Sequence, residues 1–318
     1  MARVAIIGAG VSGLTCAVAM GERGHTATIF ADEIPKLTTS AVAAAIWYPY
    51  DAFPAELVNM WALVTYGRLL QLARIPQSGV SLVDFQYLSR FGDLEVPSWA
   101  NVIGYRRIIA PKAAPYLSGF SILAPLMDTS RYLDFLTRQV RDKFGNDAFA
   151  SLHLSSLDEF RHAGFDLIVN CSGYGARKLV PDAELEPHWG QVVQVEKVPG
   201  ARAFVLDEPL TYVIPRDEDC ILGGVNTIRD CRDVDHDATR KIVERCSQML
   251  GLTTHPKIIN ELAGIRPFRA KGVYLRAEKL SDGRLVVHNY GHGGCGLSLS
   301  WGCAQKVVAL MESLLNSA

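Results

Sequence analysis

The chain lacks the marks of a membrane, nucleic-acid-binding or secreted protein. Its 318 residues carry 32 Lys and Arg against 33 Asp and Glu, so there is no excess of positive charge for nucleic acid or an anionic membrane. No apolar run reaches the roughly 18–20 residues that span a bilayer. Glycines interrupt the apolar N-terminus before it could form a signal peptide. We therefore expect a cytoplasmic protein with no membrane or nucleic-acid partner.

Cysteine is scarce and scattered. The seven cysteines are odd in number and form no C-x-x-C pair, which argues against a disulfide framework and against a zinc site. We expect free thiols in a reducing compartment and no bound metal. Cys295 stands apart, because it lies inside a glycine-rich loop and therefore near whatever that loop binds.

Glycine, by contrast, is concentrated near both ends of the chain. The apolar run at residues 3–7 predicts a buried parallel strand, and it leads directly into Gly8–Gly13, a G-x-G-x-x-G match. A helix to about residue 22 follows, then a strand at 27–30 with Asp32 and Glu33 just past its end. An acid at this distance can bind a ribose hydroxyl, so the unit predicts a dinucleotide site. The alternative is a glycine-rich turn that serves packing alone.

The second glycine-rich stretch lies close to the C-terminus. A strand-like run at 286–290 enters a loop with four glycines in six residues, and a helix is expected over about 297–315. Such a loop presents unpaired N–H groups and the positive end of a helix dipole to a ligand. We expect the two glycine-rich regions to hold one ligand from two sides.

A stretch of hydroxyl and small side chains, residues 37–46, follows the second strand. Small residues allow a phosphate or a flat ring to approach the backbone closely. The same composition suits a helix start packed tightly on a sheet, and the residues alone leave both interpretations open.

The middle of the chain predicts a second body inserted into the first. An amphipathic helix is expected at 55–75, short strands at 80–83 and 102–105, and a helix at about 131–143 capped near Asp128. A strand at 165–170 should return to the first sheet, which places the turn 171–173 at its ligand-binding edge. Strands at 192–195, 211–214 and 220–224, with a helix at 236–250, predict a second sheet.

The expected fold class is therefore α/β: a Rossmann-like dinucleotide-binding domain interrupted by a domain with a mixed, largely antiparallel sheet. We assign residues 1–50, 130–187 and 264–318 to the first, discontinuous domain. The second domain, expected to bind substrate, comprises 51–129 and 188–263.

Several of these motifs resemble the D-amino-acid oxidase family. The segment from Val287 to Ala304 is similar to that family's C-terminal signature, and Gly264–Arg269 is similar to its arginine motif. Leu37–Trp47 resembles its flavin loop, and the N-terminal fingerprint fits as well. The resemblance touches both ends and several points between, so it covers the whole chain.

The resemblance implies an FAD-dependent oxidase of D-amino acids. In that family the α-hydrogen passes to the flavin as hydride, the imino acid hydrolyses to a 2-oxo acid and ammonia, and oxygen reoxidises the flavin to give hydrogen peroxide. No side chain need act as a general base, because the protein orients the substrate and the flavin does the chemistry. The expected partners are a small D-amino acid and molecular oxygen, and a homo-oligomer is left open.

Site residues follow from the same resemblance. Arg266 matches the arginine that binds the substrate carboxylate, Tyr212 the tyrosine that helps it, and Gly294 the carbonyl that accepts from the amine. The expected substrate pocket also includes Tyr48, Tyr50, Asn226 and Cys295. The FAD-binding set is Gly8, Gly10, Val11, Ser12, Gly13, Asp32, Glu33, Thr38, Thr39, Ser40, Ala44, Ala45, Ile46, Leu154, Ser172, Gly173, Arg266, Gly291, His292, Gly293, Gly294, Cys295, Gly296, Leu297 and Ser298.

Departures from the family pattern bear on the substrate. A second pocket tyrosine carried on a lid has no counterpart, and the short segment 207–210 predicts an abbreviated lid. Asn226 stands where D-aspartate oxidases carry an arginine, which favours neutral or polar D-amino acids. The alternatives are an oxidase of D-aspartate or D-glutamate that uses Arg229 or Arg232, a dehydrogenase that reacts slowly with oxygen, and a flavin-binding protein without turnover.

Overall fold

A computed structural model describes residues 1–92, 94–112, 114–160 and 164–317. Within them the first sheet has six strands in the order β14-β15-β7-β1-β2-β6. β1 pairs in parallel with both β2 and β7, and only its first residue is exposed, as a continuous apolar run predicts. The strands are β1 (Arg3–Ile7), β2 (Thr26–Ala31), β6 (Phe149–Ser151), β7 (Leu167–Asn170), β14 (Tyr274–Lys279) and β15 (Leu285–Tyr290).

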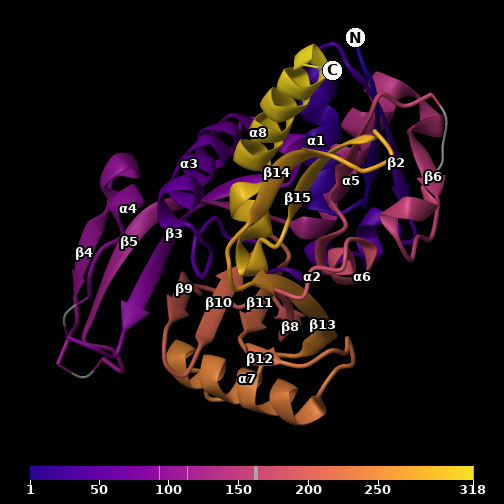
Figure 1. Ribbon diagram of the computed structural model, residues 1–318. Coiled ribbons are helices and arrows are strands. Elements are labelled where there is room, and N and C mark those ends of the chain that lie inside the picture. Colours follow the sequence, from indigo (N-terminus) through magenta and orange to yellow (C-terminus); the bar gives the residue numbers. More distant parts are fainter. Residues whose placement is uncertain (93, 113, 161–163, 318) are drawn as a thin grey trace.

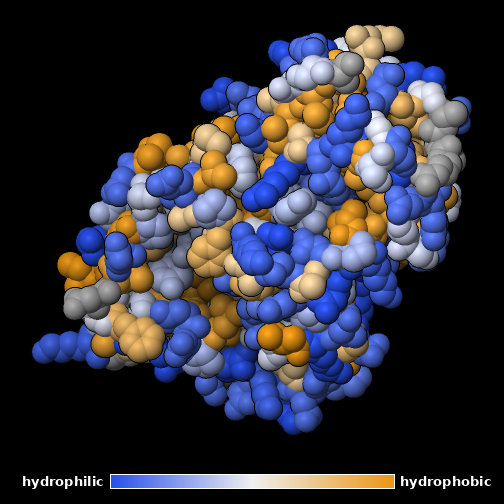
Figure 2. Space-filling view, in the orientation of Figure 1, coloured by the Kyte–Doolittle hydropathy of each residue, from blue (hydrophilic) through white to orange (hydrophobic). Residues whose placement is uncertain are grey.

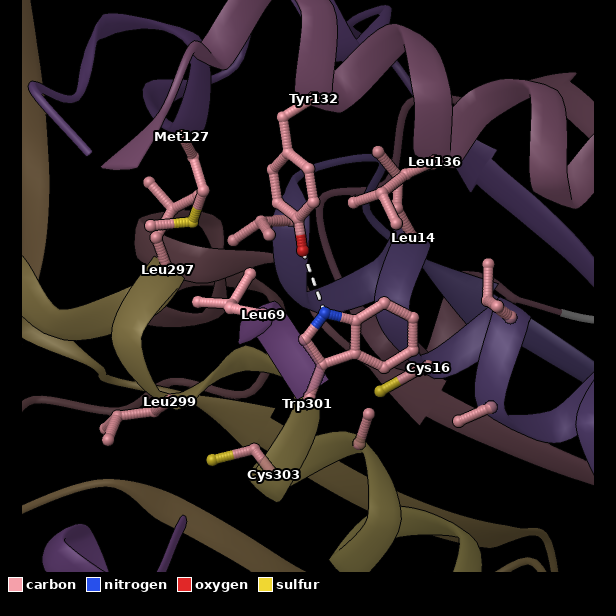
Figure 3. Close-up of a cluster of buried hydrophobic side chains, with 14 of the residues drawn as sticks. Leu14, Cys16, Leu69, Met127, Tyr132, Leu136, Leu297, Leu299, Trp301 and Cys303 are labelled. Atoms are coloured by element: carbon pink, nitrogen blue, oxygen red, sulfur yellow. Dashed lines mark hydrogen bonds between the residues drawn. The ribbon is translucent and has the colours of Figure 1, made fainter. Parts of the chain in front are cut away.

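Three long helices pack beside this sheet: α1 (Val11–Glu22), α5 (Thr129–Phe144) and α8 (Gly296–Ser317). Helix α3 (Ala55–Leu72) packs against α8 and next to β3 and β5. Figure 3 shows how their buried side chains meet around Trp301 of α8, whose indole nitrogen donates to the hydroxyl of Tyr132 on α5 at 2.8 Å. The bond satisfies two polar groups inside an apolar cluster, which would otherwise cost stability. This cluster holds α1 and α8 together, so the two glycine-rich loops before them keep a fixed separation.

The second sheet has nine strands, in the order β12-β8-β11-β10-β9-β3-β5-β4, with β13 paired to β8. Helix α7 (His236–Leu250) lies along its outer side, and β3, β4 and β5 extend away from the rest (Figure 1). The strands are β3 (Val80–Ser89), β4 (Arg106–Ile109), β5 (Ser118–Met127), β8 (Leu185–Glu196), β9 (Ala203–Leu206), β10 (Thr211–Pro215), β11 (Asp219–Gly223), β12 (Thr227–Ile228) and β13 (Ile258–Arg269).

Short helices join these elements. The α-helices are α2 (Thr39–Val42), α4 (Ser98–Ile103) and α6 (Ala176–Leu179). The 3-10 helices are η1 (Pro35–Leu37), η2 (Pro76–Ser78), η3 (Asn146–Ala148), η4 (Leu157–Glu159), η5 (Gly173–Gly175) and η6 (Gly293–Cys295).

Most sequence predictions of secondary structure are confirmed, and one is wrong. The expected strand at 102–105 is helix α4 up to Ile103, bounded by Pro97 and by Gly104, whose φ is 84°. Here Pro and Gly placed at helix ends outweigh a short apolar run. The fold class is confirmed: a parallel-centred α/β sheet is combined with a mixed, mainly antiparallel one.

Helix α3 is present, and its buried face is only partly the one that its apolar residues indicate. Trp61 and Leu69 are buried, whereas Leu57 and Met60 are 43 % and 48 % exposed. The helix turns Trp61 and Thr65 toward α8, where the Thr65 hydroxyl accepts from the Gly302 N–H at 3.0 Å. A Cβ at Gly302 would lie 2.2 Å from the Trp61 carbonyl oxygen, so a glycine in α8 permits the close approach that selects this face.

All seven cysteines are free thiols. Within the described residues no helix is long and apolar enough to cross a membrane, and no group of three or more His, Cys, Asp or Glu is placed to hold a metal ion. Strand β13 runs through the expected domain border at 263/264, so the second sheet continues to Arg269.

Candidate functional site

A single large cavity of about 540 Å³ is lined by residues of both sheets and of the loops between them. At one end are the turn after β1, the end of β2 and the turn after β7. At the other are β3, β9, β10 and β13, and residues 292–294 and 296–298 also line it. Figure 2 shows a hollow with hydrophobic side chains over β9 and β10, as located in Figure 1. A lining that combines the nucleotide-type turns with the face of the second sheet suits one long ligand together with a small one.

The turn after β1 is built for close approach of a ligand to the backbone. Gly8 has φ of 111°, and a Cβ there would lie 2.4 Å from the Cys171 carbonyl oxygen. Helix α1 begins at Val11 without a side-chain cap on Gly10, although the Val11 N–H donates to the Ser40 hydroxyl at 3.0 Å. The positive helix end therefore faces the cavity and suits a phosphate group.

Acidic side chains stand where the sequence predicted a ribose contact. Asp32 and Glu33 line the cavity just past β2. His153 Nδ1 lies 3.1 Å from an Asp32 carboxylate oxygen, and Arg232 forms an ion pair with Glu33. The remaining predicted residues that line this half of the cavity are Gly8, Gly10, Val11, Ser12, Thr38, Thr39, Ser40, Ala44, Ala45, Ile46, Leu154, Ser172 and Gly173.

Arg266 is the single arginine among the described lining residues of the sheet end of the cavity. It lies on β13 opposite His188 of β8, and its Nη1 donates to the carbonyls of Val225 at 3.0 Å and Trp189 at 3.4 Å. Burial lowers the pKa of the guanidinium, but the facing phenols of Tyr50 and Tyr212 more than offset this, so its pKa is raised. Within the described residues no acid forms an ion pair with Arg266, which leaves its charge available to an anionic ligand.

Arg269, only three residues further, is occupied differently. Its Nε donates to Asp182 at 2.8 Å, with both side chains nearly buried, and its Nη1 donates to the Gly272 carbonyl at 3.2 Å. Arg269 does not line the cavity. Of the two arginines in the motif, Arg266 is therefore the one that can receive a ligand carboxylate.

Three glycines leave room for the side chains around Arg266. A Cβ on Gly190 would lie 2.0 Å from Arg266 Nη1, one on Gly223 would lie 2.0 Å from the Tyr212 ring, and one on Gly294 would lie 2.1 Å from the Tyr50 hydroxyl. Gly223 pairs directly with Tyr212 in the sheet. Any side chain at these positions would displace the cationic and phenolic groups, so their geometry depends on glycine.

Cys295 and Tyr50 form a contact that explains the cysteine. The Tyr50 N–H donates to Cys295 Sγ at 3.0 Å, and the thiol donates back to the Tyr50 carbonyl. Cys295 is fully buried and burial raises its thiol pKa to about 12, so it remains protonated. It positions Tyr50 beside Arg266 and does not itself line the cavity.

Not every predicted site residue reaches the cavity. Gly13, Gly291, Asn226 and Cys295 do not line it, whereas His292, Gly293, Gly294, Gly296, Leu297 and Ser298 do. Asn226 is exposed, past the end of β11. Gly13 lies beneath the turn instead, where a Cβ would come within 2.0 Å of the Gly8 carbonyl oxygen.

Several lining residues of the second sheet and of its β9–β10 turn were not predicted: Phe85, Tyr87, Val192, Val205, Asp207, Leu210 and Ile214. Most of them alternate with a spacing of two residues in and next to β3, β9 and β10, and this spacing could have indicated that they share one face of the sheet. Tyr87 pairs with Val205, and Val205 with Tyr212, so a single row of side chains crosses β3, β9 and β10.

His292 gives the first testable prediction. It is buried, its Nε2 lies 3.1 Å from Asn289 Oδ1, and burial lowers its pKa from 6.5 to about 4. Between these two pH values the imidazole is protonated in the unfolded chain but neutral in the folded one. The free energy of unfolding is therefore highest above about pH 6.5 and decreases as the pH falls toward 4, by at most about 3 kcal/mol. The melting temperature of His292→Asn should therefore change less between pH 7 and pH 5 than that of the wild type.

An unchanged slope in His292→Asn would show that this imidazole is not held neutral by the fold.

Comparison with known proteins places this geometry in context. Residues 3–310 match the family model described as FAD dependent oxidoreductase. A D-amino-acid oxidase of Rubrobacter xylanophilus is 39 % identical, with 99 % of this chain and 98 % of that protein covered. A human D-aspartate oxidase is 33 % identical over 99 % and 96 %. The crystal structure of glycine oxidase from Geobacillus kaustophilus has the same fold, with a TM-score of 0.77 and 17 % identity over 98 % and 95 % of the two chains.

Proposed function

Because the chain belongs to the family of FAD-dependent oxidoreductases that includes the D-amino-acid oxidases, we propose that it oxidatively deaminates D-amino acids with bound FAD. The observation that carries the proposal is Arg266: a buried guanidinium without an acidic partner among the described residues, facing two phenols in the cavity that the nucleotide site shares. A carboxylate is the ligand that this arrangement favours.

The residues present fit FAD. The uncapped start of α1 and the Gly8 turn would receive the pyrophosphate, and the acids after β2 would receive the adenosine ribose. Residues 38–46 and 293–298 would hold the flavin ring from two sides. When bound, the flavin accepts the α-hydrogen of the substrate together with its electron pair.

The chain's own contribution is to bind and orient the substrate. Arg266 and the Tyr212 hydroxyl hold the carboxylate, and the Gly294 carbonyl accepts from the amine. These contacts fix two substituents of the α-carbon relative to residues 293–298. The space left for the side chain then determines the direction of the α-hydrogen. Cys295 lies outside the cavity and positions Tyr50 through hydrogen bonds between its thiol and the Tyr50 backbone.

The start of α8 contributes electrostatics. The helix begins at Gly296, immediately after η6, and both line the cavity through glycines and Ser298. The positive end of a helix dipole stabilises negative charge that develops nearby, and it is in place before the reaction begins.

The products proposed are a 2-oxo acid, ammonia and hydrogen peroxide, with molecular oxygen as the final electron acceptor. A D-aspartate or D-glutamate oxidase is the second candidate, favoured by the human relative. Against it, Arg229 is ion-paired with Asp235 outside the cavity and Arg232 with Glu33 at its nucleotide end. We therefore keep neutral or polar side chains as the proposed preference, and the free thiols fit a cytosolic location.

One assay tests the proposal. The purified flavoprotein is mixed with a panel of D- and L-amino acids, and flavin bleaching and peroxide are followed together. Bleaching and peroxide with D- but not L-amino acids are expected. Bleaching without peroxide would favour a dehydrogenase, preference for D-aspartate would favour the second candidate, and no bleaching by any D-amino acid would overturn the proposed function.

Tyr212→Phe gives a second testable prediction. The ring still fills the space beside Gly223, but the hydroxyl near Arg266 is lost. One hydrogen bond to a charged group contributes about 1.5–3 kcal/mol, so kcat/KM should fall by roughly 10- to 100-fold, mainly through KM. Steady-state kinetics with one D-amino acid measures this. Tyr66→Phe, which changes a phenol more distant from Arg266, is the control. An unchanged KM in Tyr212→Phe would contradict the proposal that the Tyr212 hydroxyl binds the carboxylate.

A further inference from the structure

The cavity face of the second sheet carries a negative charge that the proposed mechanism does not use. Asp207 follows β9 directly and lines the same cavity as Arg266. Among the described lining residues the other charged side chains are Asp32, Glu33 and Arg232, which lie at the nucleotide end. The half that would hold the substrate therefore has one cation and one anion.

The strand register fixes where this anion stands. Thr211 pairs with Leu206, and Leu206 with Leu88, so the next position along places Asp207 between Leu210 and Ser89. The row of Tyr212, Val205 and Tyr87 lies two residues away on the same face. One strand spacing combined with two residues along a strand separates the Cα atoms of Tyr212 and Asp207 by about 8 Å.

Asp207 is held in place by neutral groups. Its carboxylate accepts from the Ser89 hydroxyl at 2.7 Å, from the Glu208 N–H at 2.8 Å and from the Arg90 N–H at 3.4 Å. No cationic side chain forms an ion pair with it in the part of the chain that the structure describes. A carboxylate has about four lone-pair positions, so one remains for a ligand.

Aromatic rings connect the two charges. The ring of Tyr48 is stacked on Tyr50 at 5.9 Å and on Tyr87 at 5.6 Å between centroids, and all three line the cavity. Tyr50 faces Arg266, whereas the charge of Asp207 raises the pKa of Tyr87 in addition to the effect of burial. An aliphatic chain can lie along this row of rings toward Asp207.

We propose that Asp207 binds the cationic end of a basic D-amino acid whose carboxylate lies on Arg266 and whose aliphatic stem lies along the rings of Tyr48 and Tyr87. This rests on the proposed function and narrows its polar side chains to those that end in an ammonium or guanidinium group. The Cα atoms of Tyr212, which would help Arg266 to hold the carboxylate, and of Asp207 are about 8 Å apart, so a substrate that reaches both needs a long side chain such as the four-carbon stem of D-lysine. D-Glutamate would bring a second carboxylate to Asp207 and is disfavoured by like-charge repulsion.

The first test varies the substrate and keeps the enzyme unchanged. D-Lysine, Nε-acetyl-D-lysine, D-norleucine and D-glutamate are compared by kcat/KM at low ionic strength. D-Lysine should exceed both D-norleucine and the acetylated compound by about tenfold or more, and D-glutamate should be the poorest. If D-norleucine is oxidised as well as D-lysine, the inference about Asp207 fails while the proposed function stands; if none of the four bleaches the flavin and no other D-amino acid does, the proposed function fails.

The second test changes the carboxylate. Asp207→Asn keeps the size of the side chain, and its flavin content reports whether the fold is intact. The ratio of kcat/KM for D-lysine to that for D-norleucine should fall by about tenfold, and the ratio for D-glutamate should rise. Glu208→Gln removes the adjacent, exposed charge and should keep the wild-type ratios. Equal ratios in Asp207→Asn and the wild type would overturn the proposal.

Discussion

Arg266→Ala is expected to remain a yellow flavoprotein whose kcat/KM for D-amino acids is lower by on the order of 10²–10³-fold. Leaving a buried charge unpaired costs about 2–5 kcal/mol, and here the unpaired group would be the substrate carboxylate. The backbone carbonyls of Val225 and Trp189 would also lose the donor that Arg266 provides, and their oxygen atoms would then repel an anion in the space left by the side chain. Stopped-flow flavin reduction at several substrate concentrations separates the loss of binding from the loss of hydride transfer.

Two companion variants make this result specific. Arg266→Lys restores the charge without the planar fork, so it should recover part of the loss. Arg229→Ala removes an exposed arginine that pairs with Asp235 outside the cavity, and its kinetics should stay within about twofold of the wild type. Turnover retained by Arg266→Ala, or lost equally in Arg229→Ala, would contradict the assignment of the carboxylate anchor.

The site could be predicted from sequence where its signal is local. The strand, turn and helix of residues 3–22 and of 285–317 each lie within one short segment, and both are present as expected. The cap at Asp128 is local too: its carboxylate accepts from the N–H groups of Ser130 and Arg131. Such patterns are decided by residues within a few positions of one another.

The rest of the site depends on which strands meet. Tyr87 and Asp207 are far from Arg266 in sequence, and they enter the cavity because β3 and β9 pair in parallel beside β10. The spacing of residues along the chain does not predict which of these strands pair or in which register. The role of Cys295 was equally out of reach, because its partner Tyr50 lies 245 residues away. Helix α3 shows the same limit at part of its surface, since the polar Thr65 is buried against α8 while Leu57 and Met60 are exposed.

Gly13→Ala is expected to weaken FAD binding by on the order of 10- to 100-fold and to lower the stability of the protein by about 1–3 kcal/mol. The added Cβ would lie 2.0 Å from the Gly8 carbonyl oxygen and 3.1 Å from its carbonyl carbon. Both are backbone atoms, so no side-chain rotation relieves the contact. Helix α1 must move away from β1, which shifts the turn that would receive the pyrophosphate, although Gly13 itself does not line the cavity.

Flavin fluorescence titration of the apoprotein and thermal unfolding with and without FAD measure the two effects. Gly67→Ala is the matched control, because Gly67 lies in the exposed face of α3 with no atom within 4 Å of the added Cβ. That variant should bind FAD normally and gain up to about 1 kcal/mol of stability from helix propensity. If Gly13→Ala binds FAD as tightly as Gly67→Ala does, close packing of α1 on the turn is not what holds the cofactor site in shape.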